Sequence, residues 1–492
     1  MFRTPARLFA ALTVWLMTLA VWRPFAVPDE GRYTDVARWM LRSGDWVVPR
    51  LNGQPFLHKP PLYYWLEAAA MGAFGPHALV ARATSVVAAL LICSAAYALV
   101  KRWVDEPSAR WTAVLLATNP LMVLGSQYAN LDMLVASCIT VTIALAALAC
   151  GAEPTRRRHW WWAAYAVAAL GVLAKGLIGL VLPGAVFVLW SLLERRPHRL
   201  LDGLSVIGLA LMGLMVLPWF VLMERQVPDF MHFFFVVQQF ERFTEAGFNN
   251  AFGPWFYPAI VALGMLPWSL LAWPALRASG RGEGSARSLH WLALAWFAVV
   301  MVFFSMPRSK LVGYILPLAP AVAILLGPWV ARWRWRMHLA SLGAVLCAVL
   351  VGVAVFKQND DATSLARALK SQIAPSDEVV FWDRYDYAVP VALDRSTPVS
   401  VVGDWSATSR QLPDNWRREL VEGQEFAGRA DSPLVSRDQW QARALANPAR
   451  VHWIWVDRQT AASDPLLKGL PIVQSAGRVV VVVKAWPQRN AQ

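Results

Sequence analysis

Long apolar runs separated by short polar segments fill the first 356 residues of the chain. About twenty consecutive apolar residues are enough for an α-helix to cross the hydrocarbon core of a bilayer. The pattern predicts an all-α polytopic membrane domain with eleven crossings, and residues 60–79 and Pro-broken segments allow up to thirteen. The expected spans are 8–27, 81–100, 111–126, 131–150, 160–174, 176–194, 202–223, 255–275, 289–306, 311–329 and 338–356.

From residue 357 onwards the pattern is that of a soluble protein. The stretch SLARALKSQI predicts a helix, and the short apolar runs VVFW, TPVSVVG, VHWIWV and RVVVVVKA predict strands. Roughly 135 residues are sufficient for one hydrophobic core. They show no Gly-rich phosphate loop, catalytic triad or metal-binding spacing. We expect a small α/β domain over residues 357–492, following a membrane domain over residues 1–356.

Basic residues indicate which loops face the cytoplasm. The net charge of +14 could indicate nucleic-acid binding, but the cations gather in six short loops between apolar runs, where the positive-inside rule places them in the cytoplasm. An even number of expected spans separates each consecutive pair of clusters. The C-terminal domain is therefore expected outside the cytoplasm, and no nucleic-acid partner is expected. The clusters are Arg3 and Arg7; Lys101, Arg102 and Arg110; Arg156, Arg157 and Arg158; Arg195, Arg196 and Arg199; Arg277, Arg281 and Arg287; and Arg332, Arg334 and Arg336.

The cysteines are not expected to carry chemistry. Cys93, Cys138, Cys150 and Cys347 all lie within apolar runs without metal-like spacing, so neither a disulfide framework nor a zinc site is predicted. The first apolar run lacks a clear small-residue cleavage site, and we interpret it as an uncleaved first helix.

Residues 28–80 are a charged and aromatic loop between the first two long apolar spans, and we expect this loop to carry the active site. Residues at helical spacing predict an amphipathic helix in the membrane interface, which starts at Pro28-Asp29 and stops at Ser43-Gly44. Asp29 and Glu30 fall in its first turn, and Asn52-Gly53 predicts a tight turn further on. The apolar face carries Tyr33, Val36, Ala37, Met40 and Leu41, and the polar face carries Arg32, Asp35, Arg38 and Arg42.

The segment His58-Lys59-Pro60-Pro61 follows the turn. The prolines suit the first turn of a helix that runs to about Phe74, and Lys59 just before it faces the positive end of the helix dipole. Because free backbone N–H groups, the dipole and an ammonium group all point at one place, the segment predicts a phosphate-binding pocket. A lysine that reaches towards lipid headgroups is the alternative interpretation.

Two charged residues interrupt apolar segments further along the chain. Asp132 lies at the outer turn between the third and fourth expected spans, where a carboxylate at bilayer depth is costly without a partner. A helix N-cap is the alternative role for it. Lys175 splits an apolar run that is too long for one helix, and a simple turn position explains it equally well.

Later segments add cations and aromatic side chains. Arg242 lies among aromatic residues in the loop 224–254 and suits bidentate phosphate recognition, although an ion pair with a nearby glutamate is the alternative. Arg308 and Lys310, followed by the phenol of Tyr314, suit a lipid phosphate. Together the candidates describe an outward-facing site with two acids, several cations and aromatic walls, which favours a lipid-phosphate donor over soluble nucleotide chemistry.

The string PDEGRYTDVARWMLRSGDWVVPRLNGQPFLHKPPLYYW resembles the first outer loop of the ArnT-like lipid A aminoarabinose transferases. These are membrane glycosyltransferases of the GT-C type, related to the protein O-mannosyltransferases. The first-loop motif is specific to this superfamily and not to a substrate. The similarity extends through Asp132, Ala174-Lys175-Gly176, Glu241-Arg242-Phe243 and Ser309-Lys310 to Tyr314-Ile315-Leu316-Pro317.

The resemblance implies inverting transfer of a sugar from a polyprenyl (undecaprenyl) phosphate to an envelope acceptor, first lipid A with 4-amino-4-deoxy-L-arabinose. It implies Asp29 as the central catalytic carboxylate, with Glu30 and Asp132 as further acids. No cofactor is implied with certainty, and a divalent metal is left open. The donor phosphate would be held by Lys59, Arg242, Tyr314, Lys310 and Arg308, with support from Arg32, Tyr33, Tyr63, Lys175 and His58.

One position departs from the family pattern, because His58 stands where these transferases usually carry an acid. Any metal site at this loop and the identity of the substrate are therefore left open. The same chemistry on another glycan or on a protein is the alternative within the class. A transporter or flippase of lipid-linked sugars is the alternative outside it, but transporters more often show inverted repeats and midplane charges.

Overall fold

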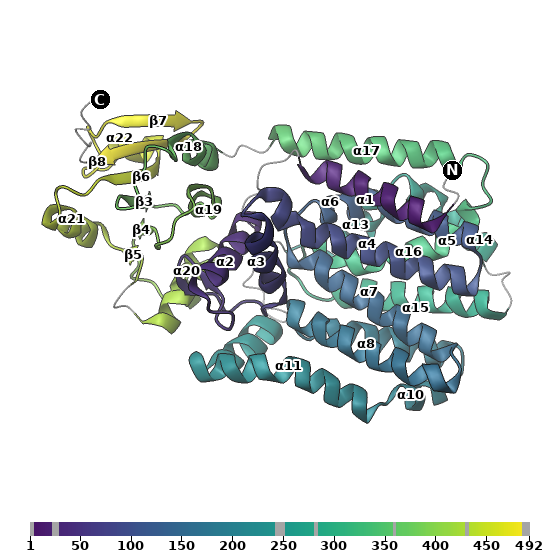
Figure 1. Ribbon diagram of the computed structural model, residues 1–492. Helices are drawn as coiled ribbons and strands as arrows, with labels where there is room; N and C mark the ends of the chain where they lie inside the picture. The colour runs from purple at the N-terminus through teal and green to yellow at the C-terminus, as the bar shows by residue number, and fades with distance from the viewer. Residues whose placement is uncertain are drawn as a thin grey trace. The chain divides into compact units, whose positions relative to one another are not determined.

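The computed structural model describes residues 4–21, 29–241, 251–279, 284–357, 361–428 and 432–484. The chain forms two compact units (Figure 1). The first comprises Met1–Arg23, His58–Leu66 and Ala78–Val355, and the second comprises Pro24–Leu57, Glu67–His77 and Phe356–Gln492. The sequence groups the whole first loop with the membrane domain, whereas most of this loop belongs to the same compact unit as the C-terminal domain.

The first unit is helical. Its α-helices are α1 (Pro5–Val21), α4 (Ala78–Trp103), α5 (Glu106–Ala117), α6 (Pro120–Ser126), α7 (Leu131–Cys150), α8 (Pro154–Lys175), α9 (Ile178–Leu193), α10 (His198–Gly203), α11 (Val206–Gln226), α13 (Phe256–Gly264), α14 (Ala272–Ser279), α15 (Gly284–Ser305), α16 (Ala319–Val330) and α17 (Arg336–Lys357). Its described residues also form the π-helix η1 (His232–Glu241) and the 3-10 helices η2 (Trp268–Leu271) and η3 (Val312–Leu318).

Each of the eleven expected spans has a helical counterpart. Among the described residues, six helices are long and apolar enough to cross a membrane, or seven if the bent pair of α13 with η2 and α14 counts as one span. That pair bends by 99° at a break that contains Pro267, and the expected span 111–126 is divided into α5 and α6 before Pro120. Residues 22–27 of the first expected span lie outside the described residues.

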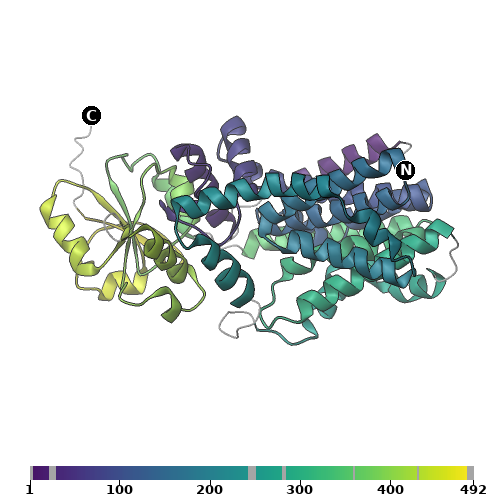
Figure 2. The ribbon, with the colours of Figure 1, turned by 90° about the horizontal axis from the view of Figure 1, so that it is seen from below.

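Two helices border the first unit on opposite sides, α17 and α11 (Figure 1). Their most apolar windows are only 17% and 22% buried within the protein, although both are rich in large aliphatic side chains. In a membrane protein such faces contact lipid. Figure 2 shows α11 along the outside of the unit, where it packs against α8.

The second unit contains an α/β domain, as the sequence predicts, with helices around a six-stranded sheet (Figure 2). The strand order is β5-β4-β3-β6-β8-β7; the first four are parallel, and β8 and β7 are antiparallel. The elements are α18 (Asp361–Leu369), β3 (Glu378–Trp382), α19 (Ala388–Leu393), β4 (Ser400–Val402), η4 (Ser409–Gln411), α20 (Trp416–Ala427), β5 (Leu434–Val435), α21 (Arg437–Ala446), β6 (His452–Asp457), α22 (Arg458–Ser463), β7 (Ile472–Ala476) and β8 (Val479–Lys484).

The four predicted strands are β3, β4, β6 and β8, and they supply most of the core of this domain. Trp382, Ile454 and Val480 are fully or almost fully buried there with Trp440 of α21. The sequence does not reveal β5, which has two residues, or β7, whose residues are largely exposed and lack an apolar run.

The first loop forms α2 (Asp29–Ser43), β1 (Arg50–Leu51), β2 (Gln54–Pro55) and α3 (Leu62–Phe74). The predicted start, stop and tight turn are confirmed, because α2 runs from Asp29 to Ser43, and Asn52-Gly53 connects β1 to its antiparallel partner β2. The predicted end of α3 at Phe74 is also confirmed. The start signal Pro28 lies outside the described residues.

The polar face of α2 is not a solvent-facing surface, which corrects the expectation of an interfacial helix. Asp35 and Arg38 are 0% and 2% exposed, and they pair at 2.6 Å. The Arg38 guanidinium also donates to the carbonyl oxygen of Arg395. Gly31 lies against α19, where a Cβ atom would come within 2.7 Å of the Ala388 nitrogen. Buried charges need partners. Asp35 and Arg38 are partners of each other, and the C-terminal domain supplies the further carbonyl acceptor for Arg38.

Candidate active site

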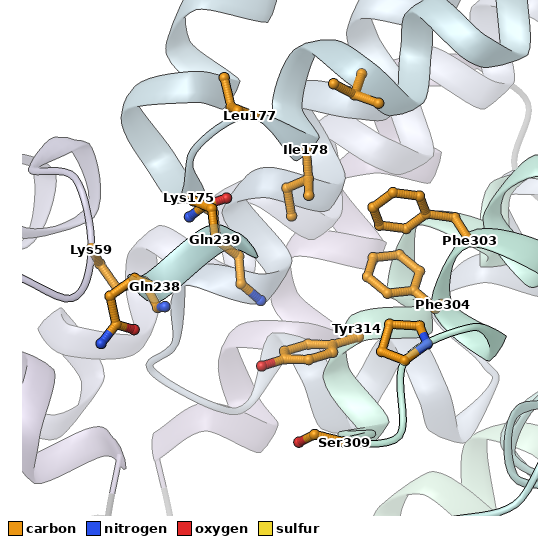
Figure 3. Close-up of a pocket in the computed structure, with 12 residues that line it drawn as sticks. Lys59, Lys175, Leu177, Ile178, Gln238, Gln239, Phe303, Phe304, Ser309 and Tyr314 are labelled. Atoms are coloured by element: carbon orange, nitrogen blue, oxygen red, sulfur yellow. The ribbon is translucent and has the colours of Figure 1, made fainter. Parts of the chain in front are cut away.

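A cavity of about 370 Å³ lies in the first unit (Figure 3). Polar side chains gather at one side of it, and Phe303 and Phe304 of α15 lie at the other. Chain segments far apart in the sequence meet here: the segment before α3, the α8–α9 junction, η1, and the segment from the end of α15 to η3. The lining residues are Lys59, Lys175, Leu177, Ile178, Val181, Gln238, Gln239, Phe303, Phe304, Pro307, Ser309 and Tyr314.

Lys175 connects the cavity to Asp132. The side chain of Asn130, which is the N-cap of α7, accepts from the backbone N–H of Asp132 at 2.8 Å, so the alternative role of Asp132 as the helix cap is wrong. The packing of α7 against α8 brings Asp132 to Lys175, the last residue of α8, and the two side chains form an ion pair with 12% of each exposed. The Lys175 ammonium lies 4.1 Å from the centre of the Tyr314 ring. Asp132, Lys175 and Tyr314 therefore contact one another in a chain that fixes their orientations.

Gly313 makes this arrangement possible. A Cβ atom at this position would lie 2.2 Å from a carboxylate oxygen of Asp132. The segment that carries Tyr314 can therefore approach Asp132 only without a side chain at residue 313. The glycine is a site residue that sequence reasoning missed.

Gln238 and Gln239 are further cavity residues that the sequence did not reveal. We interpreted residues 224–254 as a loop, whereas His232–Glu241 forms a π-helix. The wider turn of a π-helix is uncommon and occurs frequently at functional sites. Figure 3 shows both glutamine side chains beside Lys59 and Lys175. The signal in the sequence that could have indicated them is the pair of adjacent amide side chains that follows the Phe-rich run 233–235.

Asp29 lies in the second unit, in the first turn of α2. Arg32 forms ion pairs with both Asp29 and Glu419 of α20. The guanidinium also lies 4.9 Å from the centre of the Tyr33 ring. Although burial alone would lower the pKa of Arg32, the negative charge of Glu419 and the neighbouring Tyr33 and Asp29 raise it well above its ordinary value. The arginine is a permanent cation between two carboxylates.

The chain is similar to a protein-family model and to several known proteins. The family model described as dolichyl-phosphate-mannose-protein mannosyltransferase matches residues 58–221. The chain is 33% identical over 335 residues to an undecaprenyl phosphate-α-4-amino-4-deoxy-L-arabinose arabinosyl transferase of Sodalis glossinidius, a match that covers 66% of this chain and 59% of that protein. The arabinosyl transferase of the same description from Pseudomonas paraeruginosa is also 33% identical, over 64% of this chain and 58% of its own length. The chain thus spans less than two thirds of either relative.

A crystal structure of ArnT from Cupriavidus metallidurans bound to undecaprenyl phosphate superimposes with a TM-score of 0.84, over 98% of this chain and 99% of that one, at 22% identity. The chain therefore has the fold of ArnT, and about two thirds of it are similar in sequence to the aminoarabinose transferases. The resemblance that the first loop predicts is therefore confirmed, and so is the fold class of many apolar helices with a small C-terminal sheet.

Two predicted phosphate ligands, Lys310 and Arg308, are not among the lining residues of the cavity. Lys310 is 3% exposed, and its ammonium donates to the carbonyl oxygens of Pro307 and, at 3.0 Å, Phe252. Burial lowers the pKa of Lys310. The Lys310 ammonium therefore holds the backbone before η3. Arg308 is exposed, and its carbonyl oxygen accepts from the N–H of Phe252 at 3.2 Å. Arg242 lies outside the described residues.

The supporting residues predicted around Lys59 are packed within the first unit. His58 is 7% exposed and contacts the edge of the Phe233 ring, with ring centres 5.8 Å apart. Tyr63 is fully buried, and its hydroxyl donates to the carbonyl oxygen of Ala81 at 3.3 Å. Neither belongs to the lining set of the cavity, so their support of Lys59 is indirect.

A second acidic group in the second unit consists of Glu67 of α3 and Glu30 of α2. Glu30 and Glu67 are both 0% exposed, and the Thr34 hydroxyl donates to Glu67 at 2.7 Å. Burial raises the pKa of Glu67 to about 8, and the charge of Glu30 adds to this increase. Glu67 is therefore protonated at neutral pH, which makes it a neutral packing group rather than a second catalytic anion.

We expect Glu67→Gln to stabilise the protein increasingly as the pH rises from about 4.5 to about 8. The pKa of this carboxyl is 4.5 ordinarily and about 8 in the fold, so in this window the unfolded chain releases a proton that the folded chain retains. Folding then loses roughly 1.4 kcal/mol per pH unit as an upper value. Glutamine does not titrate and can still accept from Thr34.

Melting temperatures of the variant and the parent in detergent, measured across this range, test the prediction. The difference should be small at pH 4, widen up to pH 8 and then become constant. A difference that does not depend on pH would contradict it.

The described residues contain no group of three or more His, Cys, Asp or Glu side chains that could hold a metal ion. The structure therefore offers no ligand set for the divalent metal that the sequence left open, within the part of the chain that it describes. The four cysteines are free, as expected, and three of them are buried.

Proposed function

We propose that the protein is an integral membrane glycosyltransferase that moves a sugar from undecaprenyl phosphate to an envelope acceptor. The observation that carries the proposal is the cavity, which combines two lysines and a phenol at one side with an aromatic and aliphatic wall at the other. A lipid phosphate has an anionic head and an apolar chain, which match these two sides of the cavity. The names of the relatives point to 4-amino-4-deoxy-L-arabinose as the sugar, and lipid A is our proposed acceptor.

The donor phosphate would lie between Lys59, Lys175 and the amides of Gln238 and Gln239. Charge-assisted hydrogen bonds from ammonium groups to phosphate are about twice as strong as neutral ones. The ion pair with Asp132 holds the Lys175 ammonium in place and partly offsets its charge. The first isoprene units would pack along the apolar wall, which is formed by Leu177, Ile178, Val181, Phe303, Phe304 and Pro307.

Asp29 is our proposed catalytic carboxylate. During transfer the bond between the anomeric carbon and the phosphate oxygen breaks, and an acceptor oxygen forms the new bond from the opposite face. Asp29 would take the proton of an acceptor hydroxyl, or stabilise positive charge at the anomeric carbon as the phosphate leaves. For a phosphate acceptor, which is already ionised at neutral pH, only the electrostatic role applies.

Purified protein incubated with labelled undecaprenyl phosphate-aminoarabinose and lipid A tests the function, and labelled lipid A is the expected product. An acceptor series with other glycans and proteins addresses the O-mannosyltransferase-like alternative, which the match of residues 58–221 favours. In liposomes, movement of the donor across the bilayer without any transfer would support a flippase and overturn the proposal.

We further propose that the catalytic side and the C-terminal domain face the periplasm of a bacterial inner membrane. The even spacing of the six basic clusters supports this orientation. Alkaline phosphatase fused after Gln492 should be active, and green fluorescent protein at the same position should be dark. Fusions after Arg158 are the matched control and should give the reverse pattern. A fluorescent fusion after Gln492 would contradict the topology.

A further inference from the structure

The ion pair between Asp29 and Arg32 is a difficulty for a catalytic carboxylate. A carboxylate that is fully compensated by a neighbouring arginine is a weak base and gives little stabilisation to a developing positive charge. Arg32 is 15% exposed at its side chain, so solvent screens the pair only partly. Some further group must compete for the guanidinium if Asp29 is to retain effective negative charge.

Glu419 is that competing group. It lies in the first turn of α20, and its side chain is 11% exposed. Glu419 and Asp29 bind different nitrogens of the guanidinium, so one cation is shared by two carboxylates and the cluster carries a net charge of −1. The second anion prevents Arg32 from neutralising Asp29 and holds the guanidinium plane in one orientation.

Tyr387 holds Glu419 in place. Its hydroxyl donates to the second oxygen of Glu419 at 2.6 Å, and its ring centre lies 5.7 Å from the Arg32 guanidinium carbon. Tyr387 immediately precedes α19, at the point where Gly31 of α2 lies against Ala388. The close contact between α2 and α19 therefore sets the spacing of the whole chain of groups, from Tyr387 through Glu419 and Arg32 to Asp29.

We propose that Glu419 is a positioning residue for the transfer reaction, acting on Asp29 through Arg32. The C-terminal domain then has a part in catalysis without contacting the substrate through this residue. The inference rests on the proposed role of Asp29, and it assigns to α20 a function that the sequence of the domain does not reveal.

The test is Glu419→Gln, which removes the charge but keeps the shape and an acceptor for Tyr387. The turnover number kcat should fall roughly 10–100-fold, which is the loss typical when a residue that orients a functional side chain through a hydrogen bond is mutated. The KM for the donor should change less than twofold, because the cavity residues are unaltered. Tyr387→Phe retains the Glu419 charge and should cause a smaller loss of kcat.

The matched control is Asp394→Asn. Asp394 pairs with Arg42 near the other end of α2, at a more exposed position, and asparagine tolerates its positive φ of 56°. This variant should match the parent in kcat and melting temperature. If Glu419→Gln and Asp394→Asn reduce stability and activity to the same extent, Glu419 is merely structural and the proposal is wrong.

A double-mutant cycle with Asp29→Asn distinguishes the positioning role of Glu419 from the catalytic role of Asp29. If Glu419 acts through Asp29, adding Glu419→Gln to Asp29→Asn should change the residual rate less than twofold. Independent effects that multiply would overturn the positioning role, and so would an unchanged kcat in Glu419→Gln alone. A fully active Asp29→Asn variant would instead refute the proposed role of Asp29 itself.

Discussion

Asp29→Asn should reduce sugar transfer by roughly 10²–10⁴-fold, the usual cost of losing a general base, with little change in folding. Asparagine fits the first turn of α2 as well as aspartate does, and its side-chain oxygen can still accept from Arg32. It cannot carry a negative charge. If Asp29 served only to favour the helix start, its replacement would cost about 1 kcal/mol or less, and the enzyme would work normally.

Initial rates with labelled donor, together with melting temperatures, distinguish these roles. Asp45→Asn is the matched control, since Asp45 lies in the same loop and its carboxylate accepts from the N–H groups of Val47 and Val48, which asparagine can replace. The control should keep the parental rate. An active Asp29→Asn enzyme would remove Asp29 from the mechanism and leave Asp132 as the next carboxylate to test.

Lys59→Ala should weaken binding of undecaprenyl phosphate by about 1.5–3 kcal/mol, which is roughly a 10- to 150-fold increase in Kd. Lys59 is partly exposed and lines the cavity opposite the apolar wall, so its ammonium can reach a phosphate there. Partly exposed lysines contribute little to folding, and the melting temperature should therefore change much less than the affinity does.

Titration of the purified variant with undecaprenyl phosphate measures this loss. Lys59→Arg preserves the charge and should recover part of the affinity, although a planar guanidinium does not reproduce the geometry of an ammonium group. Lys370→Ala is a control for a general loss of positive charge, because Lys370 is exposed in the C-terminal domain. Normal affinity in a folded Lys59→Ala protein would contradict the proposed phosphate role of Lys59.

Local chemistry made some site residues predictable. Lys59 stands just before two prolines that precede α3, and Asp29 and Glu30 stand in the first turn of α2. Charged residues at such positions are unusual in a largely apolar chain, and each signal is contained within a few residues. Lys310 shows the limit of this reasoning. Its charge was visible in the sequence, but whether an ammonium meets a ligand or the carbonyl oxygens of Phe252 and Pro307 depends on how two distant segments fold together.

Hydrophobic periodicity and helix start and stop signals act over short distances. The apolar spans, the four main strands of the C-terminal domain and the boundaries of α2 could therefore be predicted from the sequence. Tertiary structure alone decided what each polar face meets. The charged face of α2 looks like a solvent-facing surface in the sequence, yet Arg38 reaches a carbonyl group and Arg32 reaches Glu419 in the C-terminal domain. Likewise the π-helix places Gln238 and Gln239 beside Lys175. A periodic pattern records which side of an element is polar but not its partner, since that partner comes from residues hundreds of positions away.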